Sequence, residues 1–260
     1  MPTGIQAVLF SLVLCLPAGA DAVALPQVAE LERLMAEAPV EVEVIEPQPA
    51  TTEVRPHVVY LGYPVEKVLR RVLGAGWKRA AGIEFRALDG YVSHIPAERF
   101  ERYPAYLVFA KKNSREFTLD NLVQHEQGVS LAPYYLVWDN IRHPELLKEG
   151  DTYWPYQVHE IAMLPGAGGV AGEMSQDALA LEKYCLSCHR VNGRGSNKVP
   201  QDLAVQARAL GEARFLAWVL VPASVKPDTR MPALAGGMPE TERQALAGRL
   251  FRYLNALPRQ

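Results

Sequence analysis

One short segment of the chain carries residue types with a well-defined covalent chemistry. Cys185-Leu186-Ser187-Cys188-His189 places two thiols three positions apart and an imidazole directly after the second. This C-x-x-C-H form attaches a c-type haem, because both thiols can reach the vinyl groups of one porphyrin while the histidine ligates the iron. We therefore predict one covalent haem c at Cys185 and Cys188, with His189 as the proximal iron ligand.

Two other uses of paired cysteines fit the sequence less well. A zinc site needs four donors, and the chain has no second C-x-x-C segment and no H-x-x-x-H pair. A thioredoxin-like dithiol would need a βαβ context, which the residues around the motif do not offer.

The start of the chain has the pattern of a secretory signal. We assign residues 1–22 to it, because an apolar run too short to span a bilayer is followed by small residues. Cys15 would be removed with this segment, so the two motif cysteines would be the only thiols of the mature chain. The net charge of -2 favours neither nucleic acid nor an anionic membrane surface as a partner. We predict a periplasmic or otherwise exported protein without a membrane span in its mature chain.

A glycine-rich segment divides the rest of the sequence. Residues 164–174 contain four glycines and a proline, which cannot sustain the interior of a helix or strand. They predict a linker between an N-terminal domain, residues 23–163, and a C-terminal domain, residues 175–260. Apolar periodicity in the N-terminal domain predicts an α+β fold in which strands dominate. We expect helices at 28–35 and 64–74, short helical pieces near 97 and 143, a hairpin at 83–93, and strands at 40–44, 57–62, 106–110, 134–138 and 156–163.

The C-terminal domain resembles a class I cytochrome c, which is an all-α fold. The resemblance rests on the haem motif at the end of a helix over 177–186, a middle helix that Pro222 ends, and a last apolar-striped helix reaching Leu257. An aromatic residue near the end of the last helix, Phe251 or Tyr253, also matches the family. The chain departs from the family at Asp177-Ala178, where the first helix usually has a small glycine.

This resemblance implies two further site residues. Val199-Pro200 lies where the family has a proline whose carbonyl accepts a hydrogen bond from the proximal imidazole. Met231, followed by Pro232, lies where the family has its distal methionine; Met238 is the alternative, although it directly precedes the predicted last helix. Imidazole and thioether together leave no vacant coordination position, which favours electron transfer over a haem sensor or peroxidase.

The N-terminal domain resembles the molybdopterin-binding domain of sulfite-oxidase-type oxidoreductases. The resemblance rests on the segments 88–91, 105–109, 132–138 and 154–161. That family holds molybdenum through a cysteine, and this part of the chain has none, so the resemblance implies a fold without the activity. The scattered histidines, which lack metal-ligand spacing, are predicted to be structural or exposed, and Trp138 and Trp154 to be core residues. These histidines are His94, His125, His143 and His159.

Together these patterns predict an exported monohaem c-type cytochrome that carries single electrons between redox partners. Its N-terminal domain would dock a redox protein such as a periplasmic dehydrogenase or oxidase, and the chain would have no catalytic residues of its own. The alternative is a haem-containing subunit or domain of a molybdopterin-type periplasmic oxidoreductase.

Overall fold

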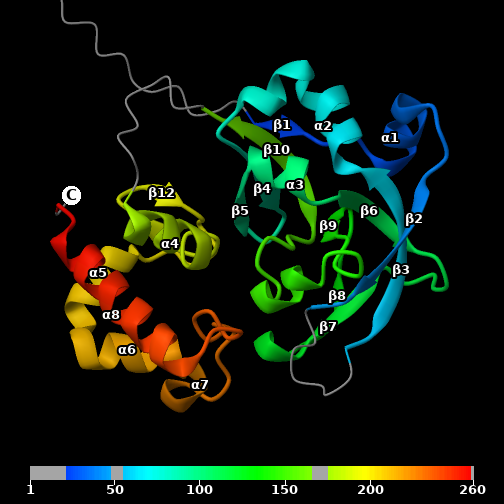
Figure 1. Cartoon of the computed structure of the whole chain (residues 1–260). Helices are drawn as coiled ribbons and strands as arrows, with labels where there is room; N and C mark the ends of the chain where they lie inside the picture. Colours follow the sequence, from blue (N-terminus) through cyan, green and yellow to red (C-terminus); the bar gives the residue numbers. More distant parts are fainter. Residues whose placement is uncertain (1–21, 48–54, 166–174, 259–260) are drawn as a thin grey trace, which may run out of the picture.

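The computed structural model describes residues 22–47, 55–165 and 175–258, and within them the chain is mixed α/β (Figure 1). The predicted signal segment lies outside the described residues except for Ala22, and so does most of the predicted linker. We refer to residues 22–165 as the N-terminal region and to residues 175–258 as the C-terminal region. Figure 1 shows the strands gathered in the first region and most of the helical turns of the second packed beside them.

Antiparallel sheets form the framework of the N-terminal region. One sheet has the strand order β1-β10-β4-β5 and another has the order β2-β3-β6-β9, and a bridge between Tyr134 and Val158 connects them. A third, two-stranded sheet pairs β7 with β8. The strands are β1 (Val23–Ala24), β2 (Val40–Ile45), β3 (His57–Pro64), β4 (Gly82–Ala87), β5 (Val92–Pro96), β6 (Ala105–Lys111), β7 (Thr118–Asn121), β8 (Glu126–Ser130), β9 (Tyr135–Trp138) and β10 (Val158–Leu164).

Short helices cover and connect these sheets. The helix α2 shows why they form where they do: Pro64 precedes its first turn, Val68 and Leu69 on one face are buried, and Gly74 follows its last residue. The α-helices of this region are α1 (Val28–Met35), α2 (Val65–Leu73) and α3 (Ala97–Arg102), and its 3-10 helices are η1 (Ala75–Arg79), η2 (Leu122–Gln124) and η3 (Pro144–Glu149).

Aromatic side chains fill the core of the N-terminal region. Trp138 is fully buried and stacks on Phe100 with ring centroids 5.2 Å apart. Trp154 is also buried, so both tryptophans are core residues as predicted. Other fully buried aromatic residues of this core are Tyr60, Tyr63, Trp77, Phe85, Tyr134 and Tyr135.

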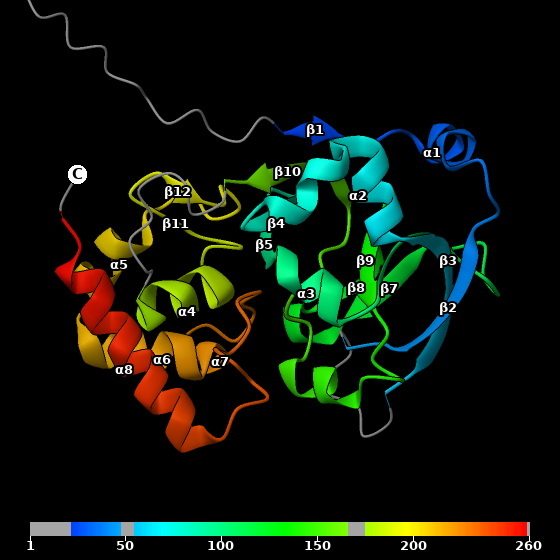
Figure 2. The same cartoon turned by 45° about the horizontal axis from the view of Figure 1, so that its top comes forward.

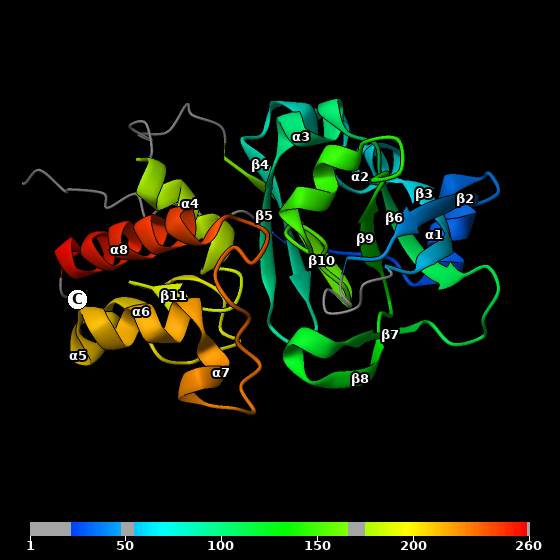
Figure 3. The same ribbon diagram turned by 60° about the horizontal axis from the view of Figure 1, so that its bottom comes forward.

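The C-terminal region packs helices around a separate, smaller apolar cluster. Its longest helix, α8, contacts α4, α5 and α6, and Figure 3 shows α8 lying along α4 and α6. The elements of this region are α4 (Gln176–Tyr184), β11 (Arg190–Val191), β12 (Arg194–Gly195), α5 (Leu203–Leu210), α6 (Glu212–Leu220), α7 (Pro222–Val225) and α8 (Glu240–Ala256).

The predicted fold class of two domains, with the second an all-α cytochrome c, is wrong. Strands β11 and β12 form an antiparallel hairpin directly after the C-x-x-C-H motif, so the C-terminal region is not all-α. Asn192 and Gly193 make this turn possible because both adopt positive φ angles, of 49° and 77°. The region is not clearly separate either, because hydrogen bonds and ion pairs connect it to β4 and β5 of the N-terminal region.

Candidate functional site

The C-x-x-C-H motif forms a tight turn at the end of α4. The amide of Cys188 donates to the carbonyl of Cys185 at 3.2 Å, and the amide of His189 donates to the same carbonyl at 2.9 Å. Both thiols are free, with Cys185 buried and Cys188 half-buried. The predicted helix over 177–186 ends earlier, at Tyr184, so the two cysteines lie in the turn that follows it.

The segment after the motif folds back and holds this turn in place. The amide of Ser196 donates to the carbonyls of Leu186 and His189, at 2.9 and 3.0 Å, and the amide of Val199 donates to Cys188 at 2.9 Å. Gly195 approaches the motif so closely that a Cβ atom there would lie 2.4 Å from the His189 carbonyl oxygen. The φ angle of Gly195 is +102°, so this position requires glycine both for space and for backbone conformation.

Burial sets the protonation of the motif. It raises the pKa of the Cys185 thiol to about 12, and it also raises the pKa of the Cys188 thiol although Lys198 opposes it. The thiols are therefore protonated at neutral pH, which does not suit a redox dithiol or a thiolate metal site. Burial lowers the pKa of His189, so its imidazole is neutral, the form that binds a metal.

The imidazole of His189 also lacks a hydrogen-bond partner. Its Nδ1 atom is buried and unpaired within the described part of the chain. Pro200 is exposed, and no hydrogen bond joins its carbonyl to His189 in the structure. The predicted role of Pro200 concerns the form with haem bound, and it stays a prediction. A buried polar atom without a partner is rare, and the predicted acceptor for Nδ1 is the Pro200 carbonyl, since an iron would bind the other ring nitrogen.

Two methionines border the same apolar cluster as the motif. Met231 and Met238 are both half-buried and pack against a cluster that includes Cys185 and Leu186. The amide of Met231 is bound to the hydroxyl of Thr229 at 3.2 Å, whereas Met238 lies just before α8. Burial does not distinguish the two as distal ligand. The remaining buried members of the cluster are Leu181, Val191, Leu203, Ala204, Ala207, Phe215, Val219, Leu234, Leu246, Ala247, Leu250 and Leu254.

These observations fit a covalent haem. Two free thiols and a neutral imidazole lie in one turn, and the thioether side chains of Met231 and Met238 pack against the apolar cluster that includes Cys185. The porphyrin would supply four nitrogen ligands, so the protein needs to provide only the axial ones. No group of three or more His, Cys, Asp or Glu side chains in the described residues could hold a metal ion without such a cofactor.

The turn between β4 and β5 packs directly against the motif. The amide of Val92 donates to the carbonyl of Ser187 at 3.0 Å, and the hydroxyl of Ser196 donates to the carbonyl of Gly90. Lys198 forms an ion pair with Asp89 in the same turn. The N-terminal region thus contacts the backbone of the C-x-x-C-H motif itself.

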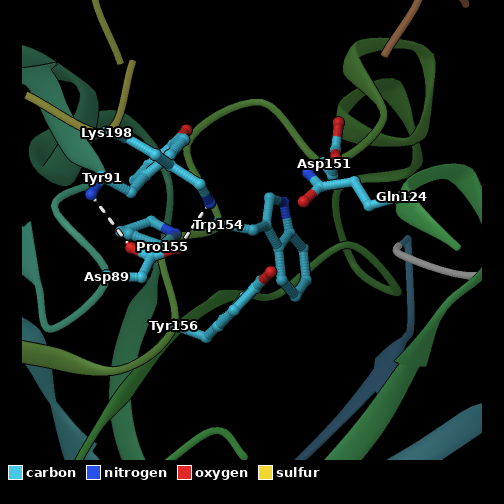
Figure 4. Close-up of a pocket in the computed structure, with 8 residues that line it drawn as sticks. All are labelled: Asp89, Tyr91, Gln124, Asp151, Trp154, Pro155, Tyr156 and Lys198. Carbon is cyan, nitrogen blue, oxygen red and sulfur yellow. Dashed lines mark hydrogen bonds and ion pairs between the residues drawn. The ribbon is translucent and has the colours of Figure 1, made fainter. Parts of the chain in front are cut away.

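A small cavity lies beside this contact. Figure 4 shows Lys198 reaching across from the C-terminal region to Asp89 of the N-terminal region, with Trp154 among the cavity walls. The cavity volume is about 30 Å³, enough for about one water molecule. Its other lining residues are Tyr91, Gln124, Asp151, Pro155 and Tyr156.

His94 joins the two regions through a pair of carboxylates. Its Nε2 lies 2.6 Å from Glu84 on β4, and its Nδ1 lies 2.5 Å from Glu182 on α4. Burial alone would lower the pKa of His94, but hydrogen bonds and charges from Glu182 and Glu84 outweigh it and raise the pKa to about 9. His94 is therefore a cation at neutral pH, held between one carboxylate of each region.

Sequence patterns gave no sign of this contact between the regions. His94 and Glu182 are 88 positions apart, and Asp89 and Lys198 are 109 positions apart. The only local signal was the Asp89-Gly90 pair, which predicts a turn and not what the turn contacts.

Comparisons with known proteins identify no family. No protein-family model matches the chain, and no curated protein matches it. None of the helices in the described ranges is long and apolar enough to cross a membrane.

Proposed function

We propose that the protein is an exported electron carrier with one covalent c-type haem. The observation that carries the proposal is the C-x-x-C-H turn, in which two free thiols and a half-buried, neutral imidazole lie together. Cys185 and Cys188 would form the thioether bonds, and His189 and Met231 would be the axial ligands. When bound, the haem supplies a site that gains and loses one electron, and the protein would carry that electron without being an enzyme itself.

The side chains around the motif would control its surroundings. The apolar cluster formed by α4, α5, α6 and α8 would keep water from the cofactor. The hairpin after the motif, with Ser196 and Val199, would fix the position of His189 through the backbone. With both His189 and Met231 bound to the iron, no substrate could bind there, and this favours electron transfer over catalysis.

The N-terminal region would dock a redox protein partner, such as a periplasmic dehydrogenase or oxidase. Its turn at Asp89-Gly90 contacts the motif, so a partner bound to this region lies near the electron-carrying group. The ion pair between Asp89 and Lys198 and the hydrogen bonds of His94 would hold the N-terminal region at a fixed distance from the motif.

The proposal is tested by a redox titration of the full-length protein produced with the machinery that attaches c-type haem. We expect one electron per chain, taken up and released reversibly, and no carbon monoxide binding to the reduced protein. The variant Met231→Ala should bind carbon monoxide and have a lower potential, because it loses its thioether ligand. The matched control Met238→Ala should do neither.

Three results would count against parts of this proposal. Carbon monoxide binding by the unaltered protein would contradict a saturated iron. A change in Met238→Ala but not in Met231→Ala would reverse the ligand assignment. A protein without a reversible one-electron transition would contradict the carrier function.

A further inference from the structure

Figure 2 shows α3 of the N-terminal region facing α4 of the C-terminal region. Residues of both helices line a second, larger cleft. Its volume is about 360 Å³, within the range of small-molecule binding sites. It is distinct from the small cavity lined by Asp89 and Lys198. The charged and aromatic residues that line it are Glu98, Arg99, Arg102, Tyr103, Tyr153 and Lys183.

Positive charge dominates the lining of this cleft. The lining contains three cationic side chains and one carboxylate, that of Glu98. Of the cations, Arg99 forms an ion pair with Glu149 at 2.8 Å. Arg102 and Lys183 form no ion pair with any residue in the described ranges. Two cations from different regions of the chain are therefore available to an anionic ligand.

Two tyrosine rings hold these cations in position. The guanidinium of Arg102 lies 5.1 Å from the ring centre of Tyr103, and the ammonium of Lys183 lies 5.7 Å from that of Tyr153. Arg99 lies between the rings, 5.3 Å from Tyr103 and 4.9 Å from Tyr153. Cation–π contacts of this kind orient the charges before any ligand arrives, which lowers the entropic cost of binding.

One donor in the cleft lacks an acceptor. The Nε atom of Arg99 is buried and has no hydrogen-bond partner among the described residues, although the end of the same guanidinium binds Glu149. Buried donors are almost always paired, so the Arg99 guanidinium keeps one unused donor next to the cleft lining. Because this atom is covered by protein, a ligand would reach it only after a local shift of the Arg99 side chain.

We propose that this cleft binds a small multivalent oxyanion, with clustered oxygens that accept from Arg99, Arg102 and Lys183. The ligand chemistry is common to organic di- and tricarboxylates and to sulfate or phosphate. Because Lys183 belongs to α4 and both arginines belong to α3, the bound anion connects the two regions. The site does not depend on a haem at the nearby motif.

The test is isothermal titration calorimetry of the full-length protein with citrate, succinate, sulfate and phosphate, each at constant ionic strength. Acetate and chloride serve as monovalent controls. We expect saturable binding of at least one multivalent anion, and a rise in the thermal unfolding midpoint with its concentration. The carboxylate and inorganic arms distinguish the two sources of the ligand.

Substitutions in the cleft test whether the anion binds there. Arg102→Gln and Lys183→Gln should each weaken the affinity about tenfold, as expected for the loss of a charge-assisted hydrogen bond. The matched control Arg71→Gln removes an exposed arginine from α2 and should leave the affinity unchanged. Circular dichroism spectra identical to that of the unaltered protein would establish that the variants are folded.

Three outcomes would overturn the proposal. One is the absence of saturable binding for every multivalent anion. Another is equal binding of acetate or chloride, which would reflect general charge screening. The third is an affinity in folded Arg102→Gln and Lys183→Gln that equals the affinity of Arg71→Gln.

Discussion

The N-terminal region fills its core with its own aromatic rings, whereas the core of the C-terminal region consists mostly of small and branched apolar side chains and includes the free thiol of Cys185. Among the largest fully buried side chains of the described residues, the tryptophans and tyrosines all come from the N-terminal region, and Phe215 alone comes from the other. The smaller cluster adjoins Cys185, Met231 and Met238, three sulfur-containing residues. The smaller core thus has fewer large side chains of its own, and it includes or contacts the sulfur-containing residues that we propose as haem ligands and attachment sites.

Buried polar groups show the same contrast. In the N-terminal region the carboxylate of Glu46 accepts from the hydroxyls of Tyr60 and Tyr135, at 2.7 and 2.8 Å. Nδ1 of His189 in the C-terminal region has no partner within the described part of the chain. The exception in the N-terminal region is Nε of Arg99, which lines the proposed anion site. Of the three unpaired buried side-chain atoms in the described residues, those of His189 and Arg99 belong to residues of the proposed ligand sites, and the third, Nε of Arg243 on α8, does not.

The largest effect is expected from breaking the aromatic core. Trp138→Ala removes a fully buried ring that stacks on Phe100 and donates to the carbonyl of Tyr153. We expect a loss of about 3–5 kcal/mol in the free energy of unfolding, measured by urea titration. Leu88→Ala, at a position 62% exposed, is the control and should change little. A loss below about 1 kcal/mol for Trp138→Ala would contradict a core that depends on its own rings.

The elements of this N-terminal region were largely predictable because their apolar residues follow simple periods. Strands β2, β4, β6, β9 and β10 and helices α1 and α2 occur where alternation or a helical stripe predicted them. Strands β7 and β8 were missed because most of their residues are polar or partly exposed, which leaves no clear alternation.

The C-terminal region was harder to predict, because its form depends on contacts that are distant in sequence. The glycine-rich segment 190–196 has the composition of a loop, yet β11 and β12 pair there and hold the motif. The prediction of a site at Cys185, Cys188 and His189 needed only the local spacing of the motif, and its haem chemistry stays a prediction. Periodicity carries no information on long-range partners such as Ser187 with Val92, so the contact between the regions was not predictable.

A smaller effect is expected at the glycine that contacts the motif. Gly195→Ala would place a Cβ atom 2.4 Å from the carbonyl oxygen of His189, at a φ of +102°. Gly193→Ala is a matched control, because its φ is also positive, at +77°, but nothing lies within 4 Å of the added atom. We expect the control to lose about 1 kcal/mol and Gly195→Ala about 2–3 kcal/mol, with a lower yield of attached haem. Equal losses would show that the motif is not held by this contact.

The smallest effect is expected at the contact between the two regions, and it depends on pH. The folded pKa of His94 is raised to about 9, above its ordinary value, so its charged pairing stabilises the fold fully below about pH 6.5. This stabilisation is lost as the pH rises through 9. Arg86 beside Glu84 and Arg194 near Glu182 keep their charge over this range, so they do not produce the change.

The measurement is the free energy of unfolding of His94→Gln and of the unaltered protein from pH 6 to pH 10. We expect the variant to be less stable by about 1–2 kcal/mol at pH 6, the difference to shrink as the pH rises from about 6.5 to 9, and little of it to remain at pH 10. His57→Gln is the control, since His57 pairs with Glu43 on the surface and should contribute little. A difference that does not vary with pH would contradict a charged His94 between the regions.

The measurement that tests the central claim most directly is the intact mass of the full-length protein after acid–acetone extraction. Covalent haem at Cys185 and Cys188 predicts that the colour stays with the protein and that its mass exceeds the polypeptide mass by one haem. In Cys185→Ala/Cys188→Ala the extra mass should be absent, whereas Ser187→Ala, which keeps C-x-x-C-H, should retain it. A bare polypeptide mass in the unaltered protein, with any haem extracted into the solvent, would contradict the account.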